Sequence, residues 1–120
     1  MNATGELYIG LMSGTSSDAI DAALVQFSNS GCELVSTLAA TLDAPILDRI
    51  NRAVDGTADR INDISELDVL LAQAFADAAL LLKDQAGVDQ ITAIGSHGQT
   101  VRHQPRGCLP YTVQLGNGAR

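Results

Sequence analysis

The chain has 120 residues, of which 46% are hydrophobic and 18% are charged, a balance typical of one globular domain. This composition excludes intrinsic disorder, and it is sufficient for a core that needs neither disulfides nor metal ions. Aromatic residues make up only 3%, so we expect a core of Leu, Ile, Val and Ala. The net charge of −7 argues against a nucleic-acid partner, because phosphate backbones require a positive surface.

The charge is unevenly distributed. All 14 acidic residues lie at or before Asp89, whereas residues 90–120 contain three arginines, both histidines and no acidic residue. This favours the C-terminal stretch as the neighbour of an anion, although chance variation over so short a segment explains it equally well.

No targeting or metal-binding signal is present. Cys32 and Cys108 form no redox or zinc motif, and the N-terminus lacks the basic region of a signal peptide. No apolar run approaches the roughly 20 residues that a membrane span needs. We therefore expect a cytoplasmic protein with reduced thiols and no membrane partner.

The predicted elements begin with three strands. Short apolar runs favour strands over Glu6–Met12, Asp21–Phe27 and Cys32–Leu42. Turn-forming residues separate them at Ser13–Asp18 and Asn29–Gly31. Strands joined by such short turns form an antiparallel meander.

Two helices are predicted next. Pro45 suits the first turn of a short helix that ends at Gly56, and its apolar face comprises Ile46, Leu47, Ile50 and Val54. A longer helix ends at Gly87, and its apolar residues recur at helical spacing: Leu67, Leu70, Leu71, Ala74, Phe75, Ala78, Leu81 and Leu82. Asp63 with Glu66 resembles a capping box at its start, and Ser65 is a rival cap.

The last segments complete an α/β pattern. Ile91–Gly95 is predicted as a strand parallel to an earlier one, because it follows a helix. We expect a loop over Gly95–His103 and a final strand over Tyr111–Leu115. This order predicts an α/β or α+β sandwich with helices packed on a mixed sheet. The residues from Gly116 resemble the start of another element, so we expect the chain to be incomplete.

The turn between the first two strands is the first candidate site. Its backbone N–H groups could surround an anion, with Gly14 free to adopt a positive φ. Thr15, Ser16 and Ser17 add hydroxyl donors, and Asp18 could hold Mg²⁺ directly or through water. An ordinary hairpin turn explains the same composition, and no Walker P-loop occurs in the chain.

The segment after the predicted parallel strand is the second candidate site, because ligands favour that location in α/β sheets. His97 and Gln99 could hydrogen-bond to a sugar or a phosphate, and Arg102 could add positive charge. The alternative is a structural histidine. His97 and His103 lack the further ligands of a metal site, and the absence of a G-x-S-x-G elbow disfavours a hydrolase using Ser16 and His97.

Three segments in order, Tyr8–Val25, Ala93–Pro105 and Tyr111–Gly116, together resemble the anhydro-N-acetylmuramic acid kinases of bacterial cell-wall recycling. The resemblance implies a ribonuclease H-like, actin-like ATPase fold in which two lobes close over ATP and a sugar. Residues 1–120 would then form part of the N-terminal lobe. The implied partners are ATP, Mg²⁺ and the sugar, and the family resemblance is compatible with a homodimer.

The resemblance also implies roles for individual residues. The ATP phosphates would be contacted by Gly14, Thr15, Ser16, Ser17, Asp18, Ala19, Ile20 and Asp21, with Asp18 near Mg²⁺. His97, Gln99 and Thr100 would face the cleft and help to place the sugar. Ala19 stands where the family usually has Gly, and a positive φ there would strain it by about 1 kcal/mol.

The implied reaction opens the 1,6-anhydro ring with water while the γ-phosphoryl group passes to O6, giving N-acetylmuramic acid 6-phosphate. The family's general-base Asp belongs to a segment beyond Arg120, so these residues alone are expected to be inactive. Two alternatives stay open: a non-catalytic nucleotide- or sugar-binding remnant or assembly module, and another sugar kinase or acetate-kinase-like enzyme of the same fold.

Overall fold

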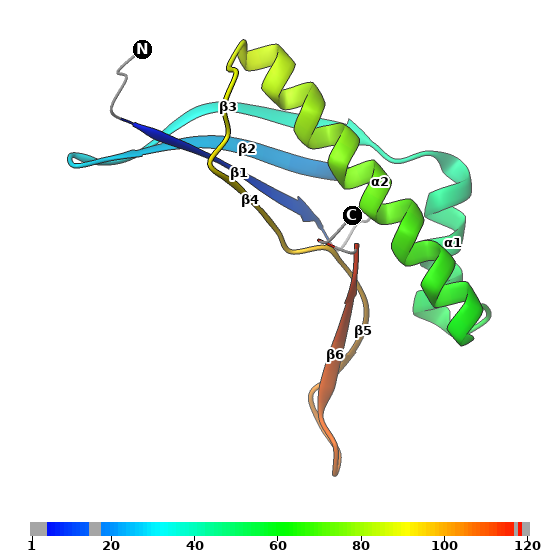
Figure 1. Ribbon diagram of the computed structural model, residues 1–120. Coiled ribbons are helices and arrows are strands. Elements are labelled where there is room, and N and C mark those ends of the chain that lie inside the picture. The colour runs from blue at the N-terminus through cyan, green and yellow to red at the C-terminus, as the bar shows by residue number, and fades with distance from the viewer. Residues whose placement is uncertain (1–4, 15–17, 117, 119–120) are drawn as a thin grey trace.

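Three strands open the chain in the computed structural model, which describes residues 5–14, 18–116 and 118 (Figure 1). They are β1 (Glu6–Ser13), β2 (Ala19–Ser28) and β3 (Gly31–Thr41). β1 pairs antiparallel with β2, and β2 pairs antiparallel with β3. The predicted meander is confirmed, with each strand one or two residues longer at some ends than the apolar pattern indicated.

A fourth strand makes the sheet mixed. β4 (Ala93–Ser96) runs parallel to β1, with Tyr8 opposite Ala93 and Leu11 opposite Ser96. The strand order in this sheet is β3-β2-β1-β4. The prediction of a parallel strand after the long helix is therefore confirmed, as is the α/β class with a mixed sheet.

The first helix, α1 (Ala44–Asp55), begins as predicted with proline in its first turn. It ends at Gly56, whose φ of 83° is the left-handed conformation that glycine adopts most readily. The prediction that Val54 is buried is wrong, because its side chain is 52% exposed. Ala53 lies on the buried face instead, three residues after the fully buried Ile50.

The second helix, α2 (Ile61–Ala86), begins earlier than predicted. Arg60 occupies the cap position, so the assignment of Asp63 or Ser65 as the cap is wrong. Asp63 instead reaches back, and its carboxylate accepts a hydrogen bond from the Arg60 N–H at 3.2 Å. Ile61 is 83% exposed, so no buried residue marks this first turn in the apolar pattern.

The core lies between the helices and one face of the four-stranded sheet. Alternate residues of β1 and β2 enter it, as the two-residue period of a strand requires: Leu7, Ile9, Leu11, Ile20, Ala22 and Leu24. α2 contributes Leu67, Leu71, Phe75, Ala78, Ala79 and Leu82. Leu70 and Leu81, predicted for the same stripe, are 36% and 53% exposed, so the buried face of α2 is narrower than its apolar pattern.

The loop expected over Gly95–His103 is wrong in its second half. Gln99–Gln104 forms β5, which pairs antiparallel with β6 (Tyr111–Leu115) in a separate two-stranded sheet. This hairpin projects away from the four-stranded sheet (Figure 1). β5 escaped prediction because Val101 is its one apolar residue, and one such residue gives no alternating pattern. The final strand, β6, is confirmed with its predicted bounds.

Candidate functional site

The β1–β2 loop, residues 14–18, connects the ends of two paired strands. Of its predicted phosphate-contacting residues, Thr15, Ser16 and Ser17 lie outside the described residues. Gly14 does not adopt the positive φ that glycine permits. Among the described residues, no atom lies within 4 Å of the position that a Cβ on Gly14 would occupy.

The far side of the loop leads into β2. The Asp18 carbonyl accepts a hydrogen bond from the Leu42 N–H at 3.3 Å, which ties the loop to the end of β3. Ala19 is the first residue of β2, and its extended backbone escapes the strain that a positive φ would cause. Ile20 is 1% exposed with its side chain in the core, so that side chain is not available to a ligand.

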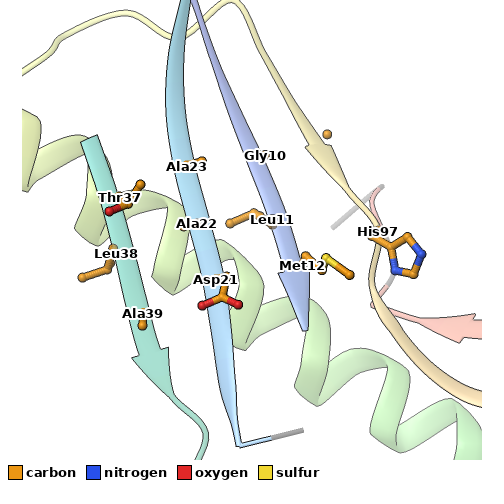
Figure 2. A pocket seen from close by; sticks show the side chains of 11 residues that line it. Gly10, Leu11, Met12, Asp21, Ala22, Ala23, Thr37, Leu38, Ala39 and His97 are labelled. Carbon is orange, nitrogen blue, oxygen red and sulfur yellow. The ribbon is translucent and has the colours of Figure 1, made fainter. Parts of the chain in front are cut away.

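A groove of about 610 Å³ runs along the sheet face opposite the core (Figure 2). Small residues line much of it and leave the strand backbones accessible. Asp21 on β2 and His97, just after β4, both line the groove, with Met12 of β1 between them. The full lining is Gly10, Leu11, Met12, Asp21, Ala22, Ala23, Thr37, Leu38, Ala39, Gly95 and His97.

His97 joins the second candidate region to the first. Its backbone N–H donates to the carbonyl of Leu11 at 2.9 Å, which extends the β1–β4 pairing by one residue. Its ring is exposed, with Nδ1 3.4 Å from the Gly98 carbonyl oxygen. His97 therefore lies at the carboxyl ends of the parallel strands β1 and β4, the edge at which α/β sheets bind ligands.

Gln99 and Thr100 differ from His97, since neither lines the groove. Gln99 is only 3% exposed; its Oε1 accepts a hydrogen bond from the Ser13 hydroxyl, and its Nε2 donates to the Thr100 carbonyl at 3.0 Å. The Thr100 hydroxyl accepts a hydrogen bond from Gln114 Nε2 at 3.0 Å. Sequence reasoning treated Ser13 as a turn residue and missed this buried pair, because 86 positions separate its members.

Arg102 is engaged elsewhere in the fold. Its guanidinium donates to the Asp59 carboxylate at 3.2 Å and to the Ala53 carbonyl at 3.2 Å. These contacts tie the hairpin to α1 and to the segment that precedes α2. The idea that Arg102 supplies free positive charge to the second candidate site is therefore not supported by its partners.

Neither a metal cluster nor a membrane span occurs in the described part of the chain. Residues 5–14, 18–116 and 118 contain no group of three or more His, Cys, Asp or Glu side chains placed to hold a metal ion. In the same residues, no helix is both long and apolar enough to cross a bilayer.

The described residues define an α/β protein with a mixed sheet, in which a groove reaches the carboxyl ends of the parallel strands β1 and β4. A family model described as anhydro-N-acetylmuramic acid kinase matches residues 6–120. The chain belongs to this family, and the resemblance carried by its three segments is confirmed.

Individual relatives agree with the family match. An anhydro-N-acetylmuramic acid kinase of Vibrio vulnificus is 47% identical over 116 residues, covering 95% of this chain and 31% of that protein. Kinases of the same name from Colwellia psychrerythraea and Coxiella burnetii are 45% and 43% identical, covering 95% and 93% of this chain and 30% of each protein. The chain thus spans about a third of the length of the curated relatives that it matches.

Proposed function

We propose that this chain forms part of an ATP-dependent kinase that opens the ring of 1,6-anhydro-N-acetylmuramic acid and phosphorylates its O6. The observation that carries the proposal is the meeting of two family segments at one sheet edge. The β1–β2 loop begins where β1 ends, and His97 is hydrogen-bonded to Leu11 of the same strand. A phosphate donor at the loop and a sugar in the groove would then be neighbours.

The loop has the properties that a phosphate tail requires. No described atom lies within 4 Å of the Cβ position of Gly14, so phosphate oxygens could approach the backbone from that side. Asp18 and Asp21 flank the loop on its β2 side, and Mg²⁺ commonly binds through one or two carboxylates together with substrate phosphates. This donor set fits a metal that arrives with ATP. The bound Mg²⁺ would neutralise charge on the transferring phosphoryl group.

The groove suits a sugar ring for a different reason. Its small side chains leave a broad, shallow apolar floor, and Asp21 and His97, on either side of Met12, offer polar atoms. Gln99 and Thr100 do not line the groove, and their side chains are bonded to Ser13 and Gln114, so they would act on a sugar there only indirectly. The general base belongs to a segment beyond Arg120 in this proposal. We also propose that the reaction takes place in the cytoplasm, where ATP is available, and that this chain forms part of the N-terminal lobe of an actin-like ATPase fold.

The direct test is a coupled ADP-release assay with Mg-ATP and 1,6-anhydro-N-acetylmuramic acid. Residues 6–120 would replace the matching N-terminal portion of the Vibrio vulnificus relative, of which this chain covers 31%. We expect the chimaera to turn over and the 120-residue chain alone to be inactive. Robust turnover by the chain alone would contradict the placement of the general base, and a folded but inactive chimaera would contradict the kinase assignment.

A non-catalytic assembly module is the second candidate, favoured by the uncovered sheet face. Tyr8, Met12, Phe27 and Leu34 belong to strands of that face, and the last three are between 45% and 61% exposed. Sedimentation of the 120-residue chain tests it, with a homodimer as the expected species. The coding sequence after Arg120 separates the two candidates, because only a kinase requires a catalytic Asp segment and a second phosphate loop.

A further inference from the structure

We propose that Met12 is a specificity-determining residue whose side chain packs against the methyl group of an acetamido substituent on the sugar. The inference rests on the proposed function, because it concerns the same groove, and it names the part of the sugar that the groove recognises. Met12 belongs to β1, and the family resemblance assigned no role to its side chain.

The Met12 side chain lies between two polar side chains of the groove (Figure 2). On one side Met12 is paired with Asp21 of β2. On the other side lies His97, whose N–H is bonded to the carbonyl of Leu11. β1 is an inner strand of the sheet, yet Met12 is 50% exposed. A flexible, polarisable thioether exposed at this place suits contact with an apolar group of a ligand.

The floor of the groove beside Met12 has room for such a group. Gly10 lies two residues before Met12 on the same strand, so the two share one face of the sheet. Gly10 is paired with Gly95 on one side and with Ala23 on the other. No described atom lies within 4 Å of the position that a Cβ would occupy on Gly10 or Gly95. A planar group could therefore lie on this floor with its edge against the Met12 thioether.

The charge beside Met12 favours one substituent of the sugar over another. The sugar of the proposed reaction carries two substituents with a methyl group, an acetamido group and a lactyl ether. The lactyl ether ends in a carboxylate, which the carboxylate of Asp21 would repel. The acetamido group is neutral, and a bare hydroxyl in its place would lose water against the thioether without gaining a partner. This part of the groove therefore selects sugars with an acetamido group.

Met12 provides its own probe, because the chain contains only one other methionine, Met1. The test uses NMR of the 120-residue chain labelled with methyl-¹³C methionine, in which every residue that lines the groove is present. At millimolar concentration, 1,6-anhydro-N-acetylglucosamine, which has the acetamido group but no lactyl ether, should shift the Met12 methyl resonance and leave that of Met1 in place. Met12→Ala identifies the resonance by removing it.

Two further sugars complete this test. 1,6-Anhydroglucose, which has neither substituent, should leave the Met12 resonance in place, whereas 1,6-anhydro-N-acetylmuramic acid should shift it. A Met12 resonance that does not respond to 1,6-anhydro-N-acetylglucosamine, or that responds equally to 1,6-anhydroglucose, would overturn the proposal. A response to 1,6-anhydro-N-acetylmuramic acid alone would overturn it in favour of the lactyl ether.

Kinetics of the chimaeric kinase test the same contact through Met12→Ala and Gly10→Val. The first variant removes the thioether, and the second fills the floor, where no described atom obstructs a new Cβ. We expect KM for the sugar to rise about tenfold in each, as the loss of a small apolar contact in a pocket implies. KM for ATP should stay within about twofold. The value of kcat should change little, because the acetamido group is not part of the bond that reacts.

Leu34→Ala is the matched control. Leu34 is 61% exposed and, like Met12, belongs to a strand of the open face, but it does not line the groove. This variant should keep kcat and both KM values. In an active chimaera, an unchanged KM for the sugar in Met12→Ala would overturn the role of Met12 and leave the kinase assignment intact. An inactive chimaera whose Met12 resonance still responds to the acetamido sugar would contradict the kinase assignment and support this inference.

Discussion

The two faces of the four-stranded sheet are built from different residues. The face toward the helices carries Ile9, Ile20 and Leu24, each at most 2% exposed. The opposite face carries Gly10, Ala23, Ala39 and Gly95 around the groove, and within the described residues no helix covers it. Packing against the helices of this chain thus explains the residues of the first face. The same packing does not explain why small residues occupy the second face.

Because the two faces differ in this way, we expect substitutions on one face to affect stability and substitutions on the other to affect binding. Substitutions on the covered face should lower the free energy of unfolding, because they leave cavities in a closed core. Substitutions on the open face or in the β1–β2 loop should change it little and act on binding instead. The predictions below test that separation, beginning with the largest expected effect.

The strongest test compares two leucines on opposite faces. Leu24 is 0% exposed in the core, whereas Leu34 is 61% exposed on β3. We expect Leu24→Ala to lower the free energy of unfolding by about 2–5 kcal/mol. Leu34→Ala should change it by less than about 0.5 kcal/mol. Urea denaturation of the 120-residue chain measures both values, and similar losses would show that the open face is also a packed one.

The next test compares two glycines of the candidate site. Gly98→Ala should cost at least about 1 kcal/mol of unfolding free energy, because its φ of 75° disfavours any Cβ and the Leu115 carbonyl occupies the space. Gly14→Ala should leave stability nearly unchanged, since its φ lies outside the left-handed range and no described atom lies within 4 Å of the position that a Cβ there would occupy.

The same Gly14→Ala substitution should nevertheless weaken the binding of ATP. A methyl group there would keep phosphate oxygens from the backbone, so we expect KM for ATP to rise at least about tenfold in the chimaera, a loss of about 1.4 kcal/mol. Denaturation and steady-state kinetics on both glycine variants provide the measurements. A destabilised Gly14→Ala protein with normal KM would reverse the assignment of the two glycines.

The sequence predicted the fold wherever local patterns determined it. The meander followed from three apolar runs and short turns, and Pro45, Gly56 and Gly87 marked helix ends through local backbone preferences. β5 was missed because its burial depends on pairing with β6 and on contact with the body of the protein, neither of which appears in a local window. Leu70 and Leu81 were misplaced because helical spacing fixes a face but not how much of it is covered.

The candidate site was predictable in its location more than in its contacts. His97 was expected at the end of a parallel strand, and it lies there beside β1. The bond between Ser13 and Gln99 joins positions 86 residues apart, and no spacing rule connects them. Gly14 was considered free to adopt a positive φ, and in the structure its φ lies outside that range.

The smallest effect concerns an exposed carboxylate at the end of α1, a helix on the core side of the sheet. The Asp55 carboxylate accepts hydrogen bonds from the Thr57 hydroxyl at 2.6 Å and from the Thr57 N–H at 2.9 Å. These bonds favour the charged form and hold the pKa of Asp55 below its ordinary value of 3.8. The stabilisation they provide is complete above that ordinary pKa and disappears as the pH falls through the lowered one.

Removal of the hydroxyl should therefore raise the pKa of Asp55. We expect Thr57→Val to move it toward 3.8, with the backbone N–H bond retaining part of the shift, while Thr57→Ser keeps the hydroxyl and the low pKa. Carboxyl ¹³C NMR titration of the three proteins measures the change. At neutral pH the valine variant should lose only a little stability, because the carboxylate is exposed, and the difference between variants should vanish in acid. A pKa of Asp55 that is the same in the valine and serine variants would assign the shift to the backbone alone.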